Sequence, residues 1–310
     1  MFQDIEPFQF HNEYRKQEPK DTDYVIITRG ETVLTDFADD QVQLPMVGMI
    51  KNLVRKPGSR DESTNYPDSG ESGNRAPSPD CRAELTYLFS VDDQAYFWLD
   101  EQSAVARRFV DQSAATFSFQ EKFKFRGKIP KETAFAASVG FHIGSWYEKN
   151  RFCGKCGQPF SHKENERALI CPHCHNVLYP KISPAMIVAI LHDGKILLSR
   201  YSDGYYRKHA LIAGYCEAGE TIEQCVHREV MEETGLKVKN LRYFKSQPWP
   251  FTGSLLMGFF ADLDGDDIVT LDRNELCEAV WFDREHLPKE DNTLSLTWTM
   301  IEYFRSHPEL

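Results

Sequence analysis

Three glutamates in the C-terminal half of the chain are spaced so that their carboxylates share one side of a helix. Glu229, Glu232 and Glu233 stand at positions i, i+3 and i+4. Like charges at this spacing destabilise an isolated helix by roughly a few tenths of a kcal/mol per pair, and a divalent cation would neutralise them. Carboxylate oxygens that leave room for water suit Mg²⁺ or Mn²⁺, so the trio predicts a site for one of these cations. The alternative is a solvated acidic helix face, which is common.

The residues around the trio predict the helix that must carry it. Thr221 and Gln224 have the spacing of a capping box, which starts a helix, and Gly235 stands where a left-handed residue would end it. Arg228 is spaced to pair with Glu232 or to orient Glu220. A compact turn formed by Gly214 and Gly219 is expected before the helix. The side expected to pack on a sheet carries Ile222, Val226 and Val230.

Four of the eight cysteines form two C-x-x-C pairs separated by fourteen residues. Four thiolates at this spacing can surround one tetrahedral Zn²⁺ and leave no coordination position open, so the ion is expected to be structural, with one ion per chain. His173 and His175 are rival ligands, but they are expected to face solvent. A zinc ribbon that reads nucleic acid is the functional alternative. The predicted zinc ligands are Cys153, Cys156, Cys171 and Cys174.

Composition limits the classes of function. The chain has 310 residues with 36 basic and 47 acidic side chains, a net charge of −11, which disfavours nucleic-acid binding as its main role. Its length suggests about two domains. No apolar run of membrane-spanning length and no secretory signal pattern occur, so an intracellular, cytoplasmic protein without a membrane partner is expected.

The hydrophobic pattern predicts a mixture of strands and helices. The segment 56–80 is rich in Ser, Pro and Gly and is expected to be a mobile loop within an N-terminal domain. A hairpin is expected around Asp193–Gly194. Strands are predicted near 24–28, 84–90, 95–99, 185–191, 195–199, 241–245, 254–261 and 279–282, and helices over 133–150, 221–233 and 294–305.

A second segment of chemical interest follows the predicted acidic helix. It reads Ser-Gln-Pro-Trp-Pro-Phe-Thr-Gly-Ser over residues 246–254. Pro248 and Pro250 predict a rigid extended loop, and Trp249 and Phe251 offer flat faces able to stack on a heteroaromatic ring. Packing of the two aromatic side chains into the core is the alternative.

The segment from Gly214 to Leu236 resembles the Nudix box, G-x5-E-x7-R-E-U-x-E-E-x-G-U with U aliphatic, at every fixed position. The resemblance implies hydrolysis of a nucleoside diphosphate linked to another group. It also implies that Glu229 and Glu233 hold the metal, that Glu232 is a further ligand or helps to deprotonate water, and that the carbonyl of Ala213 is a metal ligand.

The cysteine cluster upstream and the 246–254 segment downstream resemble the zinc-ribbon subfamily of NADH pyrophosphatases. The subfamily implies a homodimer, in which Tyr179 of the second subunit and Tyr215 sandwich the nicotinamide. It implies Glu275 as an outer metal-binding carboxylate, with Glu278 as the alternative. Thr252–Gly253 departs from the usual Pro-x, which is expected to loosen the loop. The further implied substrate contacts are Glu166, Gln247, Pro248, Trp249, Pro250, Phe251, Thr252, Gly253, Ser254 and Thr297.

These resemblances imply an α+β protein. An α/β N-terminal domain over 1–148 and a zinc ribbon over 149–180 precede a Nudix α/β/α sandwich with a mixed sheet over 181–310. The implied reaction is metal-dependent hydrolysis of NADH, and of NAD⁺, to NMNH or NMN and AMP. Two alternatives remain: removal of the NAD cap from RNA 5′ ends, and a non-catalytic module that senses nucleotides.

Overall fold

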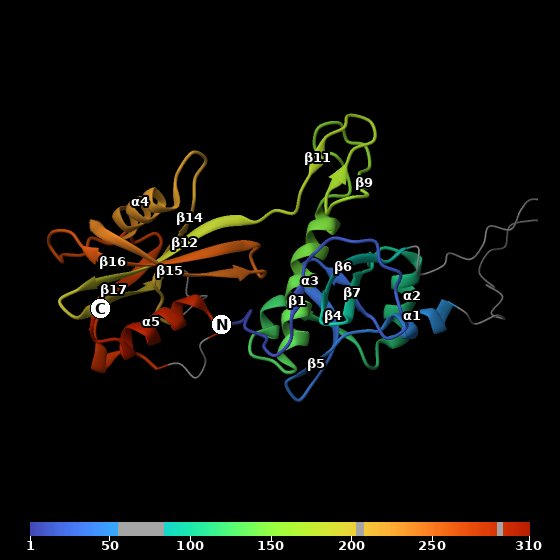
Figure 1. Cartoon of the computed structure of the whole chain (residues 1–310), viewed down its shortest axis with the longest axis horizontal. Helices are drawn as coiled ribbons and strands as arrows, with labels where there is room; N and C mark the ends of the chain where they lie inside the picture. Colours follow the sequence, from blue (N-terminus) through green and yellow to red (C-terminus); the bar gives the residue numbers. More distant parts are fainter. Residues whose placement is uncertain (55–83, 203–207, 290–293) are drawn as a thin grey trace, which may run out of the picture. The chain divides into compact units, whose positions relative to one another are not determined.

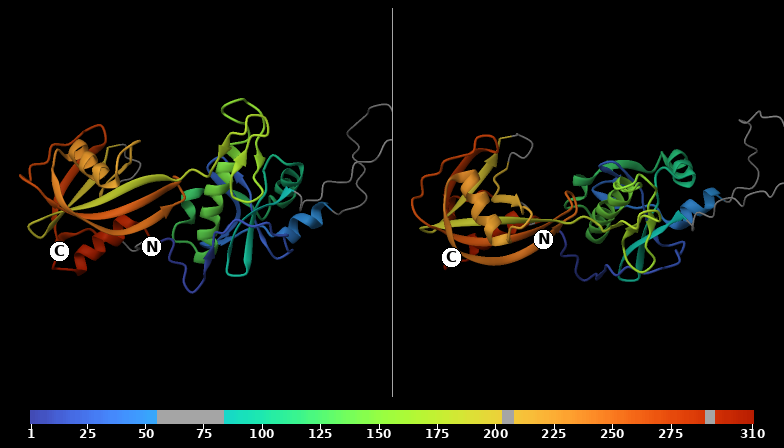
Figure 2. Two further views of the ribbon diagram at one scale, coloured as in Figure 1. Left: turned by 45° about the horizontal axis from the view of Figure 1, so that its top comes forward. Right: turned by 90° about the horizontal axis from the view of Figure 1, so that it is seen from above.

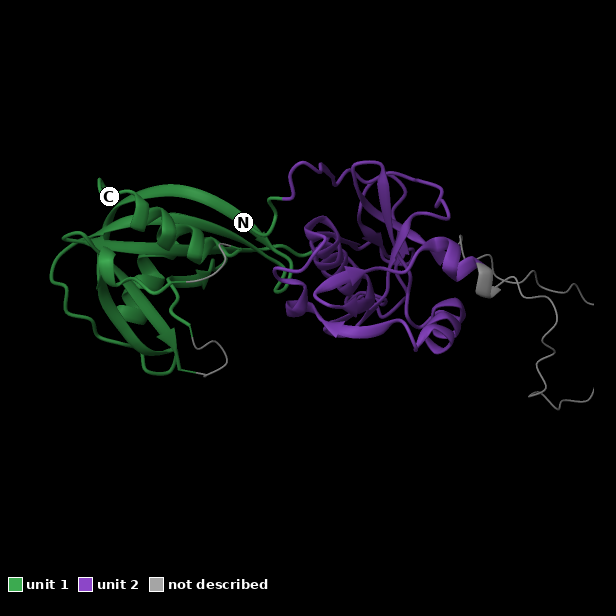
Figure 3. Cartoon of the chain, turned by 90° about the horizontal axis from the view of Figure 1, so that it is seen from below, with its two compact units in different colours: residues 1–4, 181–310 green, residues 5–180 purple. Residues whose placement is uncertain are grey.

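The computed structural model describes residues 1–54, 84–202, 208–289 and 294–310. The predicted loop 56–80 lies outside these residues. Two compact units are present: unit 1 comprises residues 1–4 and 181–310, and unit 2 comprises residues 5–180 (Figure 3). The ribbon thus belongs to the same unit as the N-terminal segment, and the expected three-part division stays a prediction.

Unit 1 is built on a six-stranded sheet in the order β15-β16-β12-β13-β17, with β14 paired to β12 (Figure 1). β12 and β16 run parallel, in register from Ser183–Ser254 to Leu191–Asp262, and the other pairs are antiparallel. The mixed sheet expected from the sequence is confirmed. The strands are β12 (Ser183–His192), β13 (Lys195–Tyr201), β14 (Ile212–Tyr215), β15 (Val238–Trp249), β16 (Ser254–Leu263) and β17 (Leu276–Asp283).

Two helices, α4 (Ile222–Thr234) and α5 (Leu296–Ser306), cover opposite faces of this sheet (Figures 1 and 2). Successive side chains of a strand point to opposite faces, so β12 contributes to two cores. Its even-numbered residues, such as Val188, pack with α4, and its odd-numbered residues, such as Ala189, pack with α5. The predicted α/β/α sandwich and the apolar stripe of α4 are both confirmed. A short 3₁₀ helix, η3 (Arg284–His286), precedes α5.

The hairpin expected at Asp193–Gly194 joins β12 to β13. Both turn residues have positive φ angles, 46° and 74°, as a two-residue turn between twisted strands requires. The expected loop after residue 245 is wrong, because β15 continues to Trp249. Pro248 is tolerated there since β15 is an edge strand, where a missing N–H costs no ladder hydrogen bond.

In its described residues, unit 2 contains two small sheets, three α-helices, one 3₁₀ helix and the three strands of the ribbon. The first sheet has the order β1-β6-β7-β2, and in the second β3, β5 and β8 pair with β4. The strands are β1 (Phe10–His11), β2 (Tyr24–Ile26), β3 (Thr28–Arg29), β4 (Thr32–Ala38), β5 (Gln41–Gln43), β6 (Thr86–Val91), β7 (Gln94–Trp98) and β8 (Ser118–Glu121). The helices are α1 (Val47–Val54), α2 (Ala104–Ser113), η2 (Lys122–Phe125) and α3 (Lys131–Lys149), and the ribbon strands are β9 (Ser161–His162), β10 (Leu169–Ile170) and β11 (Val177–Leu178).

The helix α3 is the centre of unit 2 and leads into the ribbon (Figure 1). Its small residues let strands approach closely: a Cβ at Gly140 would lie 2.7 Å from Ile26, and one at Gly144 would lie 2.7 Å from Trp98. The helix is therefore buried on more than the single face predicted from Phe135 and its neighbours.

None of the helices in the described ranges combines the length and the apolar character that a bilayer crossing requires.

Candidate active site

The acidic helix α4 begins and ends as its sequence predicts. The Thr221 hydroxyl accepts a hydrogen bond from the Gln224 N–H, and the Gln224 side chain accepts one from the Thr221 N–H. Gly235 adopts a left-handed conformation with φ 70° and donates its N–H to the Met231 carbonyl. These caps fix which side of the helix the glutamates occupy.

Glu233 lies inside unit 1 rather than in solvent. The residue is only 3% exposed, and its Oε2 has no hydrogen-bond partner among the described residues. Burial raises the pKa of Glu233 to about 8, and the negative charges of Glu229, Glu275 and Asp272 add to the rise. An unpartnered buried carboxylate next to other carboxylates is costly unless a cation is present.

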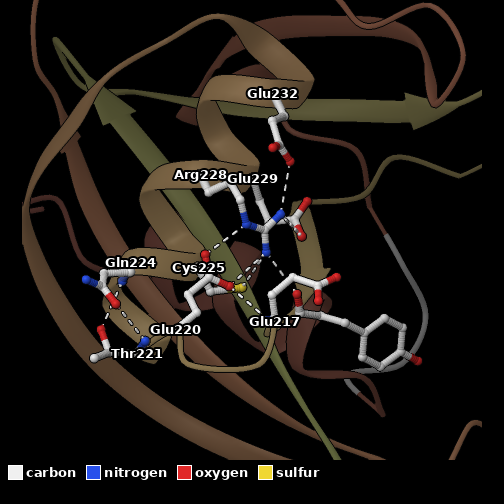
Figure 4. Close-up of polar contacts among 9 residues, drawn as sticks. Glu217, Glu220, Thr221, Gln224, Cys225, Arg228, Glu229 and Glu232 are labelled. Atoms are coloured by element: carbon white, nitrogen blue, oxygen red, sulfur yellow. Dashed lines mark hydrogen bonds and ion pairs between the residues drawn. The ribbon is translucent and has the colours of Figure 1, made fainter.

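Arg228 is the centre of a network that joins four oxygen-bearing groups (Figure 4). Its guanidinium holds Glu220 at 2.8 and 2.9 Å, Glu229 at 2.8 Å and Glu232 at 2.9 Å. It also donates to the Tyr215 carbonyl at 3.0 Å. Both predicted partners, Glu232 and Glu220, are therefore confirmed, and the ion pair lowers the pKa of Glu220 to about 2.

Gly214 has a different role from the turn residue that was predicted. It lies on β14, and a Cβ at this position would overlap the carboxyl group of Glu229. Gly219 does adopt a turn conformation, with φ 91°. The absence of a side chain at Gly214 thus creates the space in which Glu229 sits, one residue after the predicted carbonyl ligand at Ala213.

The two candidates for the outer carboxylate have different surroundings. Glu275 lies close enough to raise the pKa of both Glu229 and Glu233. Glu278 lies on β17 and pairs with Arg200 at 3.4 Å. Which of the two is the outer metal-binding carboxylate stays a prediction, for which Glu275 is the first candidate. Asp272, which the sequence reasoning missed, joins the same group, and its N–H donates to the Glu233 carbonyl at 3.1 Å.

These residues fit a divalent cation by the chemistry of their donors. Carboxylate oxygens are hard ligands, and one of them, Oε2 of Glu233, is buried without a partner among the described residues. Within the described parts of the chain, however, the four cysteines alone form a group of metal-ligand atoms that all lie within 4.8 Å of one another. The carboxylates do not converge to that degree, since Arg228 bonds both Glu229 and Glu232.

The segment from residue 247 to residue 254 forms a hairpin end rather than a free loop. Gln247 is fully buried, and its amide bonds to Gln3, to the Leu294 carbonyl and to the Leu296 N–H. Phe251 is 1% exposed and contacts Phe2 and Trp249. The aromatic ring of Phe251 therefore packs in the core, as the alternative interpretation proposed, and only Trp249 of the two remains partly exposed.

The departure at Thr252–Gly253 is compensated by local bonds. The Thr252 and Ser254 hydroxyls lie 2.6 Å apart, and the Thr252 N–H donates to the Trp249 carbonyl at 3.3 Å. Gly253 has φ 69°, which closes the turn. Pro248 is exposed and Pro250 is buried, and Thr297 lies in the first turn of α5. Substrate contact by any of these residues stays a prediction.

The four cysteines of the ribbon converge as their spacing predicts. Sγ of Cys153 lies 3.6 Å from that of Cys174, and Sγ of Cys156 lies 3.4 Å from that of Cys171, too far for disulfides at about 2.05 Å. Four sulfur atoms in one group suit a tetrahedral zinc ion.

The two halves of the cysteine cluster are built alike. Gly157, with φ 72°, donates its N–H to the Cys153 carbonyl, and His175, with φ 58°, donates its N–H to the Cys171 carbonyl. The two N···O distances are 2.8 and 2.9 Å, respectively. His173 and His175 are exposed, as predicted.

The remaining predicted substrate residues fall in different units. Glu166 and Tyr179 meet in unit 2, where Tyr179 donates to the Glu166 carboxylate at 3.1 Å and Lys163 forms an ion pair with it. Tyr215 belongs to unit 1, and its side chain is largely exposed. The pairing of Tyr179 with Tyr215 around one ring stays a prediction.

Comparison with known proteins agrees with this arrangement. The NUDIX domain model matches residues 181–303, and the model of the NADH pyrophosphatase zinc ribbon domain matches residues 148–179. A protein of Klebsiella pneumoniae (strain 342) named NAD-capped RNA hydrolase NudC is 47% identical over 152 residues, which cover 49% of this chain and 59% of the relative. The protein of the same name from Enterobacter sp. (strain 638) is 48% identical over 152 residues and 58% of its length. The match thus spans less than two thirds of these curated relatives.

Among solved structures, a NUDIX hydrolase from Nitrosomonas europaea is similar at 25% identity and a TM-score of 0.45, over 51% of this chain and 93% of that one. The two domain models, which match adjacent segments of the chain, give the order that the sequence predicts, a zinc ribbon of the NADH pyrophosphatase type followed by a Nudix domain.

Proposed function

We propose that this protein hydrolyses the pyrophosphate bond of NADH, and of NAD⁺, to NMNH or NMN and AMP with a divalent cation. The observation that carries the proposal is the buried Glu233 carboxylate, whose Oε2 has no partner among the described residues and which faces further carboxylates. A protein gains nothing in stability from such a group. Its retention inside a Nudix domain is explained if it binds a cation for catalysis.

Glu229, Glu233 and Glu275, together with the Ala213 carbonyl, would hold Mg²⁺ or Mn²⁺. The bound cation would offset charge on the leaving phosphate and lower the pKa of the attacking water. Glu232 is the most exposed of the three helix glutamates. Once its carboxylate has separated from the Arg228 guanidinium, it would accept a proton from the attacking water. Arg228 holds the second carboxylate, Glu229, against β14.

Substrate recognition in this proposal uses the aromatic rings that remain accessible. The exposed Tyr215 and the partly exposed Trp249 present faces for stacking, whereas Phe251 supports Trp249 from the core. Tyr179 would approach from the second subunit of a homodimer, as the resemblance to NADH pyrophosphatases implies. The zinc ion of the ribbon has a structural role, since four thiolates leave no position open.

The cytoplasm is the compartment that we propose for this reaction. The four thiols of the ribbon form a metal-type cluster, and clustered cysteines that bind metal are more frequent in intracellular proteins than in secreted ones.

Removal of the NAD cap from RNA is the second candidate, because two relatives of the chain are named NAD-capped RNA hydrolases. It breaks the same kind of bond, but it requires surface for an RNA chain. The net charge of −11 gives little support for extended phosphate contacts. A non-catalytic sensor is less consistent with the site, because a binding module has no need for a buried carboxylate that destabilises it.

The test is a comparison of substrates with one matched variant. We expect turnover of NADH, NAD⁺, ADP-ribose and NAD-capped RNA in Mg²⁺ or Mn²⁺, with the highest kcat/KM for NADH and a loss of at least a thousandfold in Glu233→Gln. The control is Glu278→Gln, which removes the carboxylate that pairs with Arg200. Turnover of none of the four would support the non-catalytic sensor instead. The highest kcat/KM for ADP-ribose, which has no nicotinamide, would contradict the proposed stacking of the nicotinamide on the aromatic rings.

A further inference from the structure

Two cysteines at the junction of β14 and α4 have no role in the proposed reaction. Cys216 directly follows β14, and Cys225 is the fourth residue of α4. Cys225 is fully buried and Cys216 is half-buried, and both pack in the core between α4 and the sheet. Both thiols are free in this structure. A single buried cysteine acts as a small apolar side chain, whereas a second thiol beside it makes oxidation to a disulfide possible.

The two thiols are in contact with each other. The Cys225 side chain lies within hydrogen-bonding reach of the Cys216 side chain. Burial raises the pKa of the Cys225 thiol, and the contact with Cys216 adds to the rise. A guanidinium joins the same two segments of the chain, because Nη2 of Arg228 lies 3.5 Å from the Cys225 Sγ and 3.0 Å from the carbonyl oxygen of Tyr215 (Figure 4). The contact between the thiols is therefore part of a packed arrangement.

The backbone on both sides of this contact is fixed by hydrogen bonds. The Cys216 N–H donates to the Pro184 carbonyl of β12 at 3.2 Å. The Cys225 N–H donates at 2.9 Å to the carbonyl of Thr221, the N-cap residue of α4. A disulfide requires an S–S distance of about 2.05 Å between residues whose backbones already lie close together. Two thiols in contact on fixed backbones can reach this distance by small rotations of their side chains.

Cys216 is the thiol that an oxidant reaches first, because Cys225 is 0% exposed. With a low-molecular-weight disulfide as the oxidant, the Cys216 sulfur loses its proton and attacks one sulfur of the oxidant. The S–S bond of the oxidant breaks and one thiolate is released. The Cys225 sulfur then loses its proton and attacks the Cys216 sulfur, which releases the second thiolate. The two protons end on the released thiolates, and two electrons pass from the protein to the oxidant.

We propose that Cys216 and Cys225 are a reversible oxidation site, at which a low-molecular-weight disulfide converts the two thiols into one intramolecular disulfide. In a reducing compartment such bonds are usually transient and respond to the redox state. Cys277, the exposed cysteine of the same unit, contacts the carbonyl of Tyr201 at 3.4 Å and serves as a control.

The bond would change the geometry around Arg228. A bond to Cys216 turns the Cys225 Sγ away from Nη2 of Arg228, whose Nη1 holds Glu229. It also moves the residue next to Tyr215, whose exposed ring we assign to stacking on the substrate. We therefore expect the oxidised protein to turn over NADH more slowly. This consequence, unlike the bond itself, rests on the proposed function.

The test is peptide mass mapping of the full-length, zinc-loaded protein after incubation with oxidised glutathione, followed by alkylation of the remaining thiols in denaturant. One tryptic peptide, residues 209–228, carries both cysteines, because no lysine or arginine lies between Lys208 and Arg228. We expect this peptide to carry no alkyl group and to be lighter than its reduced form by two hydrogen atoms, and dithiothreitol should reverse the change. Cys216→Ser and Cys225→Ala should each prevent the bond, and Cys277→Ser should not.

The same samples are assayed with NADH in Mg²⁺ or Mn²⁺. Oxidation should lower the kcat/KM of the wild type at least about tenfold through displacement of Arg228 and Tyr215, and should leave that of Cys216→Ser unchanged. The variant thereby separates this bond from oxidation of the zinc ribbon.

A peptide 209–228 that stays fully alkylated, or that carries glutathione on both cysteines, would overturn the proposal. Equal turnover by the reduced and the oxidised wild type would overturn the effect on the site. Absence of turnover by the reduced protein would contradict the proposed function alone, because the peptide mass still decides whether the bond forms.

Discussion

Glu233 and Arg228 lie five residues apart on α4 and have opposite electrostatic situations. Glu233 is buried among other acids without a partner, whereas Arg228 bonds three carboxylates and a carbonyl. The sequence predicted the partners Glu232, an i, i+4 neighbour on the helix, and Glu220, but not the bonds of Arg228 to Glu229 and to the Tyr215 carbonyl. It could not predict that Glu233 is buried, since burial depends on which strands and loops pack beside the helix end.

Replacement of Glu233 by glutamine should separate stability from activity. Without added divalent cation, Glu233→Gln is expected to have a higher Tm than the wild type and a free energy of unfolding that is larger by about 2 kcal/mol. The reason is that the substitution removes a buried acidic group that neighbouring carboxylates repel. Mg²⁺ or Mn²⁺ should raise the Tm of the wild type only. Differential scanning calorimetry with and without the cation measures both effects, and a lower Tm of the variant in cation-free buffer would contradict them.

The pair between Arg228 and Glu220 predicts a loss of stability in acid. Because the folded pKa of Glu220 is about 2, below the ordinary 4.5, its contribution is fully present above pH 4.5 and is lost as the pH falls through about 2. Glu220→Gln should therefore be less stable than the wild type at pH 7, and the difference should shrink between pH 4.5 and pH 2. Urea unfolding followed by circular dichroism measures it. Glu217→Gln, an exposed neighbour, is the control and should show no such change.

Gly214 is the residue whose role the sequence suggested wrongly. A glycine before an acidic helix is typical of a turn, and only the register of β14 against α4 shows that it makes room for Glu229. Gly214→Ala should displace Glu229, lower kcat/KM at least about tenfold and lower the Tm through overpacking. Gly154→Ala is the control, because a Cβ there meets nothing within 4 Å. Equal activity of the two variants would show that Glu229 has no fixed position in catalysis.

At the scale of elements, β15 shows where sequence patterns are insufficient. Two prolines predicted a loop after residue 245, but an edge strand accepts proline, and the strand continues to Trp249. Within this continuation the Gln247 side chain bonds to two segments distant in sequence, at Gln3 and at Leu294 and Leu296. No local pattern reveals such contacts. The helices α1 and α2 were likewise not predicted, whereas α4, with its caps and apolar stripe, was.

Gln247 should therefore contribute to the stability of unit 1 whether or not it contacts a substrate. Gln247→Ala leaves the Leu296 N–H without its buried acceptor, and we expect a loss of about 2–3 kcal/mol in the free energy of unfolding. Lys245→Ala, on an exposed position of the same strand, should change it by less than about 0.5 kcal/mol. Chemical denaturation measures both variants, and similar values for the two would contradict a structural role of the buried amide.

At the scale of the whole molecule, each unit has its own sources of stability. Unit 1 has two cores, one on each face of its sheet. Unit 2 has a core around β2, α1 and α2, and its ribbon consists of three two-residue strands. Strands this short cannot hold the ribbon together by themselves, so its fold depends on the four thiolates.

Removal of zinc should therefore affect the two units differently. Calorimetry is expected to show two transitions, and Cys171→Ser, or a chelator strong enough to remove the zinc, should lower the Tm of one of them by about 10 °C or more. The other transition, which belongs to unit 1, should stay where it is, since no cysteine of the cluster lies in that unit. Cys277→Ser, an exposed cysteine of unit 1, is the control. A single transition that shifts as a whole would instead show that zinc stabilises both units together.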